Sequence, residues 1–161
     1  MSRPKALPDD VRNICIQLIR GYERRVREYY SLRREVINER RCRRVEVKDP
    51  ENPDKTIWVY PPNQHCAGRN TEEIALRLAA IDRRMDTKII HAIDDARVRI
   101  GADLPEELRT KLSDAIWRNC CNGRRYPYEF LDVPGIGRTN FYERRTQFLI
   151  DIAYGVGLLG D

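Results

Sequence analysis

Apolar residues recur at intervals of three and four along the first forty residues of the chain. They occupy the positions Val11, Ile14, Cys15, Leu18, Ile19, Tyr22, Val26, Tyr29, Tyr30, Val36 and Ile37. This spacing places them on one stripe of a helix whose flanks are rich in arginine. Pro8 followed by Asp9 and Asp10 is typical of a helix start, because acidic side chains favour the positive end of the helix dipole. We therefore expect one long helix from about Pro8 to about Arg41.

A second long amphipathic helix is expected between Asn70 and Gly101. Asn70 and Glu73 have the spacing of a capping box. Apolar residues then follow in steps of three and four: Ile74, Leu78, Ile81, Met85, Ile89, Ile93, Ala96 and Ile100. Gly101 suits the left-handed position after a helix. The two long helices should pack antiparallel and bury both stripes, either within one chain or in a coiled-coil-like dimer.

The pattern changes between the two helices, over residues 42–70. Val45 and Val47 alternate with charged residues, and Ile57 and Val59 alternate with aromatic ones. The proline-rich sequence PENPD separates the two runs. This arrangement predicts a small β-hairpin flanked by loops, with a wholly disordered linker as the alternative.

The sequence after Gly101 predicts one further helix from about Asp103, just before Pro105, to about Asn122, where Gly123 ends it. Two shorter helices around a glycine turn are expected after that. Near Phe130 and Leu131 a short apolar helix end precedes the turn at Gly135, where glycine can adopt a positive φ. The helix after the turn has an apolar underside made of Ile136, Phe141, Phe148, Leu149 and Ile152. The fold class is therefore mainly α, with an antiparallel helical arm carrying the hairpin over residues 1–101 and a helix-turn-helix head over residues 102–161.

Polar side chains at the start of that last helix are candidates for contact with DNA, because major-groove readers place base contacts in the first turns of such a helix. The candidate base-reading residues are Arg138, Thr139, Tyr142 and Glu143, with Thr146 expected on the same face. Arg can grip guanine, Glu can accept from cytosine, and Thr or Tyr can touch a thymine methyl group. The candidate phosphate-binding residues are Arg124, Arg125, Asn140, Arg144 and Arg145. An ordinary solvated helix face with intrahelical pairs is the alternative reading.

These motifs resemble a phage pattern. The segments Phe130-Leu131, Pro134-Gly135-Ile136-Gly137, Arg138-Thr139-Asn140 and Phe141-Tyr142, with the later Arg145, are similar to the helix-turn-helix of phage late-gene transcriptional regulators of the RinA and ArpU type, which are similar to region 4 of sigma factors. The sequence departs from that pattern at Leu131, Pro134 and Gly137. The resemblance implies binding at a phage promoter and activation of packaging, structural or lysis genes, with host RNA polymerase as a further candidate partner. It also assigns base reading to Arg138, Thr139, Tyr142 and Glu143.

Composition agrees with a basic, helix-rich protein. Charged residues make up 34% of the 161 residues, the formal net charge is +5 and the sequence pI is about 9.1. Only five of the 30 basic residues are Lys, and Arg favours bidentate contact with phosphate and guanine. A GC-rich genome would give the same bias. The chain has no apolar run of the roughly 20 residues that span a membrane and no secretory signal. The five scattered Cys residues fit a reducing compartment, so we expect the cytoplasm of a bacterial host.

The sequence shows no catalytic constellation, so we expect no enzyme activity and no cofactor. His65 and Cys66 lack a second pair of ligands at zinc spacing, so we expect no metal site. The expected function is that of a sequence-specific, double-stranded DNA-binding transcriptional regulator acting as a homodimer, without a membrane partner. Two alternatives remain: a small terminase-like packaging subunit that forms rings, and a phage-encoded inhibitor module that binds a host protein.

Overall fold

The computed structural model of the chain describes residues 6–38, 45–59, 71–122 and 135–160. Six α-helices and one two-stranded antiparallel sheet lie within these residues. The chain divides into two compact units. Unit 1 combines residues 1–27 with residues 84–161, and unit 2 comprises residues 28–83. The expected mainly α fold with a small antiparallel hairpin is confirmed.

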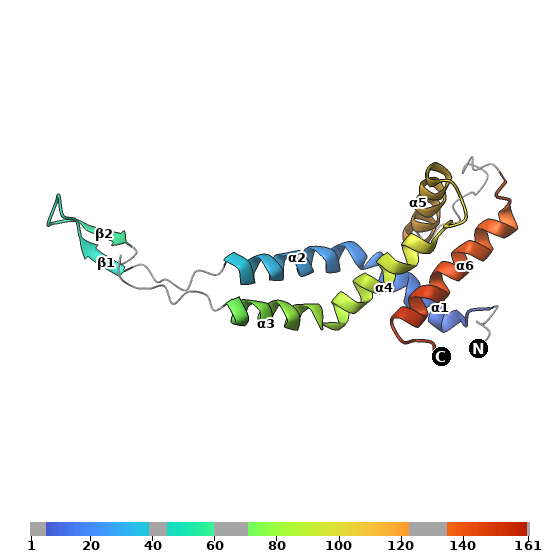
Figure 1. Ribbon diagram of the computed structural model, residues 1–161, viewed down its shortest axis with the longest axis horizontal. Helices are drawn as coiled ribbons and strands as arrows, with labels where there is room; N and C mark the ends of the chain where they lie inside the picture. The colour runs from blue at the N-terminus through green and yellow to red at the C-terminus, as the bar shows by residue number, and fades with distance from the viewer. Residues whose placement is uncertain (1–5, 39–44, 60–70, 123–134, 161) are drawn as a thin grey trace. The chain divides into compact units, whose positions relative to one another are not determined.

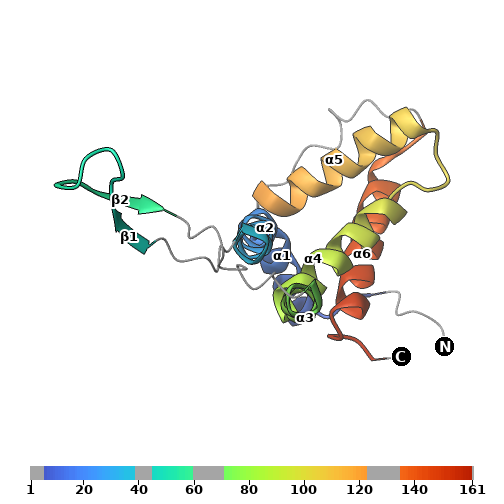
Figure 2. The same cartoon turned by 60° about the vertical axis from the view of Figure 1, so that its left-hand side comes forward.

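Unit 1 is built from helices that come from both ends of the chain (Figures 1 and 2). They are α1 (Asp9–Arg20), α4 (Met85–Arg99), α5 (Glu106–Asn122) and α6 (Arg138–Gly155). Helix α4 packs along α6, and α1 packs against both α5 and α6. Their apolar faces meet in one core, whose fully buried large side chains include Ile19, Ile93, Leu112, Ile116, Phe141, Phe148, Leu149 and Ile152. The expected stripe on each helix thus supplies the core.

This packing differs from the expected division into an arm over residues 1–101 and a head over residues 102–161. Because α1 and α4 bury their apolar faces against α5 and α6, they belong to the same compact unit as the end of the chain. Helix α5 begins immediately after Pro105 and ends at Asn122, as the sequence predicts. The supporting helix expected around Phe130 and Leu131 lies outside the described residues, so the complete helix-turn-helix stays a prediction.

The first long helix is broken at Gly21, which the apolar spacing did not indicate. Helix α1 ends at Arg20 and α2 (Tyr22–Asn38) begins one residue later. The Arg25 guanidinium folds back over Gly21, and its Nη1 donates to the carbonyl oxygen of Leu18 at 2.9 Å. A Cβ atom at Gly21 would lie 2.5 Å from that nitrogen. Glycine therefore leaves room for an arginine that satisfies a carbonyl at the end of α1.

The second long helix is also broken, at Arg83 and Arg84. Helix α3 (Thr71–Asp82) ends there and α4 starts at Met85, with Arg84 in an extended conformation (φ −64°, ψ 148°). Asp86 lies in the first turn of α4 and accepts a hydrogen bond from Arg25 Nε at 3.0 Å. The expected end of the helix is confirmed, since Gly101 adopts a positive φ of 65° just beyond it.

In unit 2, the later part of α2 and helix α3 run side by side in opposite directions (Figures 1 and 2). Asp82 at the end of α3 accepts hydrogen bonds from Arg33 Nη1 at 2.9 Å and from the Tyr29 hydroxyl at 3.0 Å. Val36 and Ile81 are the buried apolar residues of this pair. The two helices therefore bury few apolar side chains and are also joined by hydrogen bonds to the Asp82 carboxylate.

The hairpin of unit 2 joins β1 (Val45–Lys48) to β2 (Thr56–Val59). The strands pair in an antiparallel register that sets Val47 opposite Ile57 and Glu46 opposite Trp58. The turn is closed by a hydrogen bond from the Asp49 amide to the Lys55 carbonyl oxygen at 2.8 Å. The sequence alternation therefore gives the hairpin one aliphatic face and one mixed face, on which Trp58 is 62% exposed.

The contact between α4 and α6 depends on a glycine at the end of α6. A Cβ atom at Gly155 would lie 2.7 Å from the Cβ of Ala92 and 3.3 Å from its Cα. We expect Gly155→Ala to lower the free energy of unfolding by about 1–2 kcal/mol, because the steric conflict outweighs the gain in helix propensity. Urea unfolding followed by circular dichroism measures this. Gly160→Ala is the control, because a Cβ there meets no atom within 4 Å. Equal stability of both variants and the wild type would contradict the prediction.

Candidate nucleic-acid interface

Helix α6 begins at the glycine turn that the sequence predicts. Gly135 has a φ of 81°, and Gly137 is extended and precedes the first helical residue, Arg138. Within the described part of the chain no side chain caps this helix start, and its first turn contains no acidic residue. The amide groups of the first turn therefore carry the partial positive charge of the helix dipole without a neighbouring carboxylate in that turn.

The underside of α6 is fixed in the core of unit 1. Phe141, Phe148, Leu149 and Ile152 are all buried, and Ile136 packs against the same core from the turn. This confirms the apolar face that the sequence predicts. Because the buried residues extend from the second turn to the last, α6 is held along most of its length while its first turn remains exposed.

The open face of α6 differs in part from the expected one. Arg138, Thr139 and Glu143 are exposed, as expected of base-reading residues. Tyr142 is half-buried and packs edge-on against Phe141, with ring centroids 5.3 Å apart. Thr146 is also half-buried, and its hydroxyl donates to the carbonyl oxygen of Tyr142 at 2.8 Å.

Two exposed amide side chains complete this face. Asn140 and Gln147 are exposed, and they follow Thr139 and Glu143 by one and four residues, so all four lie on one side of the helix. From the sequence, Asn140 is a candidate phosphate-binding residue, and Gln147 is not among the predicted site residues. The signal for Gln147 was its spacing of four from Glu143, because both then share the exposed stripe. Gln147 Nε2 also donates to Asp151 Oδ1 at 2.9 Å.

Arg144, an expected phosphate-binding residue, is engaged by two neighbours. Its Nη1 and Nη2 donate to Oδ1 and Oδ2 of Asp103, each at 2.7 Å, and its Nε donates to Asn140 Oδ1 at 2.6 Å. The Asp103 side chain is 61% exposed and that of Arg144 is 24% exposed. Hydrogen bonds from Arg144 lower the pKa of Asp103 to about 2, and the same contact raises the pKa of Arg144. The pair joins the turn after α4 to the second turn of α6.

The other expected phosphate-binding residues are arranged differently. Arg145 is half-buried, and its Nε atom is buried without a hydrogen-bond partner among the described residues. It lies beside Cys120 of α5, where burial raises the pKa of the thiol and the Arg145 guanidinium opposes that increase. Arg124 and Arg125 lie outside the described residues. The structure therefore brings Asn140 and Arg144 together, while Arg145 faces α5.

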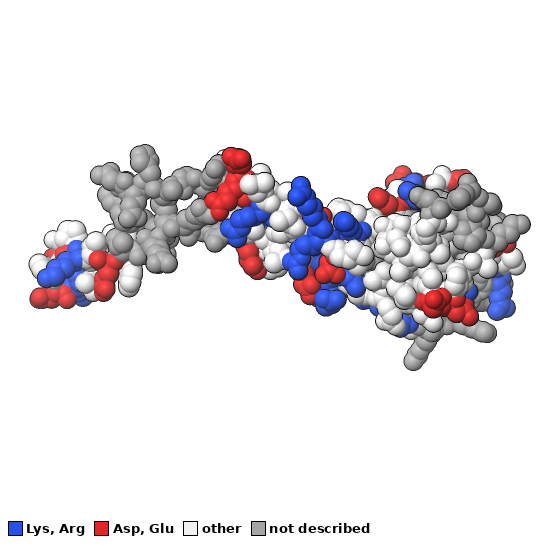
Figure 3. All heavy atoms as spheres, turned by 90° about the horizontal axis from the view of Figure 1, so that it is seen from below, with Lys and Arg blue, Asp and Glu red and all other residues white. Residues whose placement is uncertain are grey.

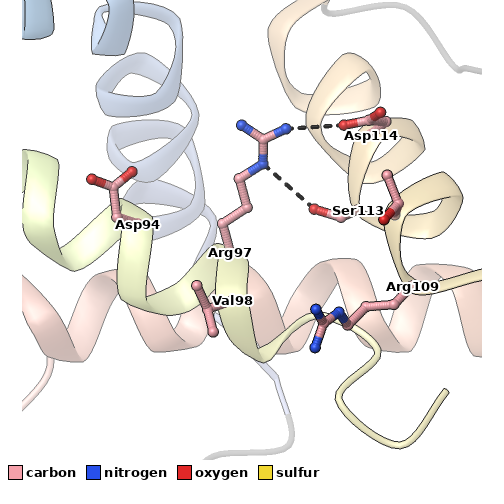
Figure 4. A pocket seen from close by; sticks show the side chains of 7 residues that line it. Asp94, Arg97, Val98, Arg109, Ser113 and Asp114 are labelled. Carbon is pink, nitrogen blue, oxygen red and sulfur yellow. Dashed lines mark hydrogen bonds and ion pairs between the residues drawn. The ribbon is translucent and has the colours of Figure 1, made fainter. Parts of the chain in front are cut away.

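A groove of about 400 Å³ lies elsewhere in unit 1, between α4 and α5 (Figure 4). Arg97 reaches across it to Asp114 at 2.9 Å and to Ser113 at 3.5 Å, and its guanidinium lies 4.8 Å from the Trp117 ring centroid. Asp94 accepts a hydrogen bond from Tyr22 at 2.6 Å. The carboxylates that line the groove are therefore already hydrogen-bonded, and neither His nor Cys lines it to activate Ser113.

The described cysteines are buried or half-buried in unit 1. Cys15 is fully buried, and its Sγ lies 3.6 Å from the Leu149 carbonyl oxygen. Burial raises the pKa of Cys15 to about 11 and also raises the pKa of Cys121. Because the thiolate is the reactive form, these side chains serve the core rather than nucleophilic chemistry.

The surface charge does not by itself locate an interface. On the face drawn in Figure 3, uncharged atoms cover most of the described surface of unit 1, and acidic and basic side chains stand at its edges. The basic residues of each helix therefore indicate its suitability for a phosphate contact better than the charge of the whole surface does. At α6 they are Arg138, which is exposed, Arg144, which is paired with Asp103, and Arg145, which is half-buried.

Comparisons of the chain with protein-family models, with curated proteins and with solved structures give no match. None of the helices in the described part of the chain is long and apolar enough to cross a membrane. The same residues contain no group of three or more His, Cys, Asp or Glu side chains that could hold a metal ion. His65 and Cys66 lie outside them.

The Asp103–Arg144 pair should give the protein a measurable acid dependence. The pKa of Asp103 is about 2 in the folded chain, against an ordinary value of 3.8. Its contribution to stability is therefore complete above about pH 4 and is lost as the pH falls towards 2. We expect the difference in Tm between the wild type and Asp103→Asn to be larger at pH 5 than at pH 2, as measured by circular dichroism. Asp95→Asn, at an exposed carboxylate of α4, is the control, and an identical pH profile for all three proteins would contradict the prediction.

Proposed function

We propose that the chain binds double-stranded DNA sequence-specifically through the start of α6 and regulates transcription of phage or prophage late genes, most simply as an activator. The observation that carries this proposal is the combination of a buried underside and an exposed polar first turn. Phe141 and Phe148 hold the helix in the core, while Arg138 and Thr139 lie at its exposed end beyond the Gly135 turn. A helix held in this way can enter a major groove with its N-terminal residues leading.

The side chains on this face suit the edges of bases. An arginine such as Arg138 can donate two hydrogen bonds to guanine O6 and N7, and Glu143 can accept one from the amino group of cytosine. Asn140 and Gln147 carry amides, the groups that pair with adenine, and such pairing would replace the bonds that Asn140 Oδ1 accepts from Arg144 and that Gln147 Nε2 donates to Asp151. Thr139 can contact a thymine methyl group. Base reading by Tyr142 would use only the exposed part of a half-buried side chain.

The net charge supports a polyanionic partner without locating the contact. A charge of +5 favours association with DNA, and the uncapped start of α6 offers backbone amides to a phosphate. The resemblance to RinA and ArpU type regulators adds the proposal of a phage promoter as the target and host RNA polymerase as a second partner.

The two alternatives make different demands on the protein. A packaging subunit requires a ring of eight or more copies, and a protein-binding module requires an activity that survives loss of DNA binding.

Binding to fragments of the DNA around its own gene tests the proposal. We expect tight binding to one fragment that weakens between 50 and 200 mM salt, because phosphate contacts release counterions. The double variant Arg138→Ala, Glu143→Ala should lose about 2–4 kcal/mol of binding free energy to that fragment and little to the others. Fluorescence anisotropy at both salt concentrations measures the affinities.

The matched control is Lys111→Ala, Glu107→Ala. It removes one basic and one acidic side chain from an exposed ion pair of α5, whose atoms lie 3.3 Å apart. It should bind as the wild type does. Equal affinity of the wild type for every fragment, or equal losses in the two double variants, would contradict sequence reading by α6 and favour the packaging or protein-binding alternatives.

We also propose that the protein is a homodimer that uses the helix pair of unit 2. Ile37 of α2 is 52% exposed and Leu76 of α3 is 65% exposed. A pair of helices this short buries few apolar residues within itself, so these two exposed side chains are available to a further contact. Burying these side chains against a second copy would extend the core of the pair. A dimer would also carry two copies of α6, and dimeric major-groove readers contact two half-sites about one helical turn apart.

Changing these two residues to lysine tests the dimer. We expect the wild type to have twice the chain mass of 19.0 kDa at micromolar concentration, and Ile37→Lys, Leu76→Lys to shift the equilibrium to the monomer. Sedimentation equilibrium measures both. The control variant, Met85→Lys, Val98→Lys, changes two exposed apolar residues of α4 in the same way and should remain dimeric. A monomeric wild type, or dissociation of the control alone, would contradict this assignment.

A further inference from the structure

The hydrogen bonds that Arg144 makes to Asp103 and Asn140 affect how α6 can bind the phosphates of DNA. Arg144 follows Asn140 by four residues, so it lies at the edge of the exposed face formed by Thr139, Asn140 and Glu143. Each of its three nitrogen atoms donates to an oxygen of Asp103 or Asn140 within 2.7 Å. These bonds use three of the five N–H donors of the guanidinium, and its positive charge is already offset by the Asp103 carboxylate, so its attraction to a phosphate is weak while that pair is intact.

Among the described residues, the formal charges around this face cancel. Arg138 and Arg144 are the basic residues there, and Glu143 and Asp103 are the acidic ones. The described part of the start of α6 is therefore close to neutral in a chain whose net charge is +5. Neutrality weakens the attraction to phosphates that every DNA sequence shares, and it leaves the hydrogen bonds to base edges unchanged.

We propose that Asp103 is a specificity-determining residue: by holding Arg144, it lowers affinity for DNA of any sequence, so that base contacts decide which DNA is bound. This inference rests on the proposed DNA-binding function. If Arg144 moved from Asp103 to a phosphate, one charge-assisted pair would replace another, and the Asp103 carboxylate would remain exposed near the DNA backbone. The exchange gains little, so Arg144 adds almost nothing to nonspecific binding while Asp103 is present.

Replacing Asp103 by Asn should free Arg144 for a phosphate. We expect Asp103→Asn to bind both the target fragment and an unrelated duplex several-fold more tightly than the wild type. The gain should be larger for the unrelated duplex, so the ratio of the two affinities falls. The slope of log K against log salt should steepen by about 0.9, the value for one additional phosphate contact on B-DNA.

Three further variants separate this effect from a general change in charge. Asp95→Asn removes another exposed carboxylate and should steepen the salt dependence less than Asp103→Asn does. Arg144→Gln should leave the slope of log K against log salt unchanged, because Arg144 contacts no phosphate in the wild type, although the uncompensated Asp103 carboxylate weakens binding to both duplexes alike. In the Asp103→Asn background, however, the same Arg144→Gln change should abolish the gain. This non-additivity identifies Arg144 as the group that Asp103 restrains.

Each other outcome overturns the inference. Equal gains for Asp103→Asn and Asp95→Asn would show that only net charge matters, and a salt slope for Arg144→Gln that is flatter by about 0.9 would show that Arg144 already contacts phosphate. Weaker binding by a folded Asp103→Asn would make Asp103 a residue that positions α6 for DNA. If Asp103→Asn does not fold, the Arg144→Gln variant alone decides. Absence of DNA binding by every protein, including the wild type, would instead overturn the proposed function together with this inference.

Discussion

The close packing of α4 against α6 is the contact on which unit 1 depends. Helix α4 comes from the middle of the chain and α6 from its end, so neither has a local partner for its apolar face. Gly155 allows the end of α6 to approach Ala92, and the buried rings of Phe141 and Phe148 then meet residues of α1, α4 and α5 in one core. Close approach of two helix backbones requires a small residue at the point of contact. The same packing fixes the direction in which α6 presents its first turn.

The positions of the helices could be predicted from the sequence, but their breaks could not. Apolar spacing predicts every described helix, and alternation predicts the hairpin. Gly21 lies in the middle of a regular apolar stripe, and its effect depends on the Arg25 side chain that folds over it. At Arg83 and Arg84 the sequence contains neither glycine nor proline to mark the end of a helix. The Gly21 break thus involves a side-chain contact that apolar spacing does not report, and the same Arg25 also binds Asp86 in the first turn of α4, 61 residues further along the chain.

Some features of the candidate interface could be predicted from local sequence, and others depend on contacts between distant residues. The turn at Gly135 and the buried underside of α6 follow from local sequence, because a glycine signal and an apolar period each act within a few residues. The pairing of Arg144 with Asp103 joins residues 41 positions apart, and no spacing rule reaches that far. Tyr142 is half-buried for a related reason: its position relative to the core depends on how α6 is rotated against α1 and α4. Sequence therefore located the helix, whereas tertiary packing decided which of its side chains are available.

The number of arginines in the sequence does not tell how many of them are available to a partner, because some form ion pairs within the fold. Twenty-five arginines and a pI of about 9.1 favour a nucleic-acid partner for the chain as a whole. Four of these arginines, all in the described part of the chain, are paired between elements: Arg25 with Asp86, Arg33 with Asp82, Arg97 with Asp114 and Arg144 with Asp103. An arginine in such a pair joins two helices, or a helix and a turn, and adds little net charge to the surface around it. Under the proposed function this pairing would favour specific recognition, because a protein whose arginines were all available to phosphates would bind any DNA strongly and discriminate poorly between sequences.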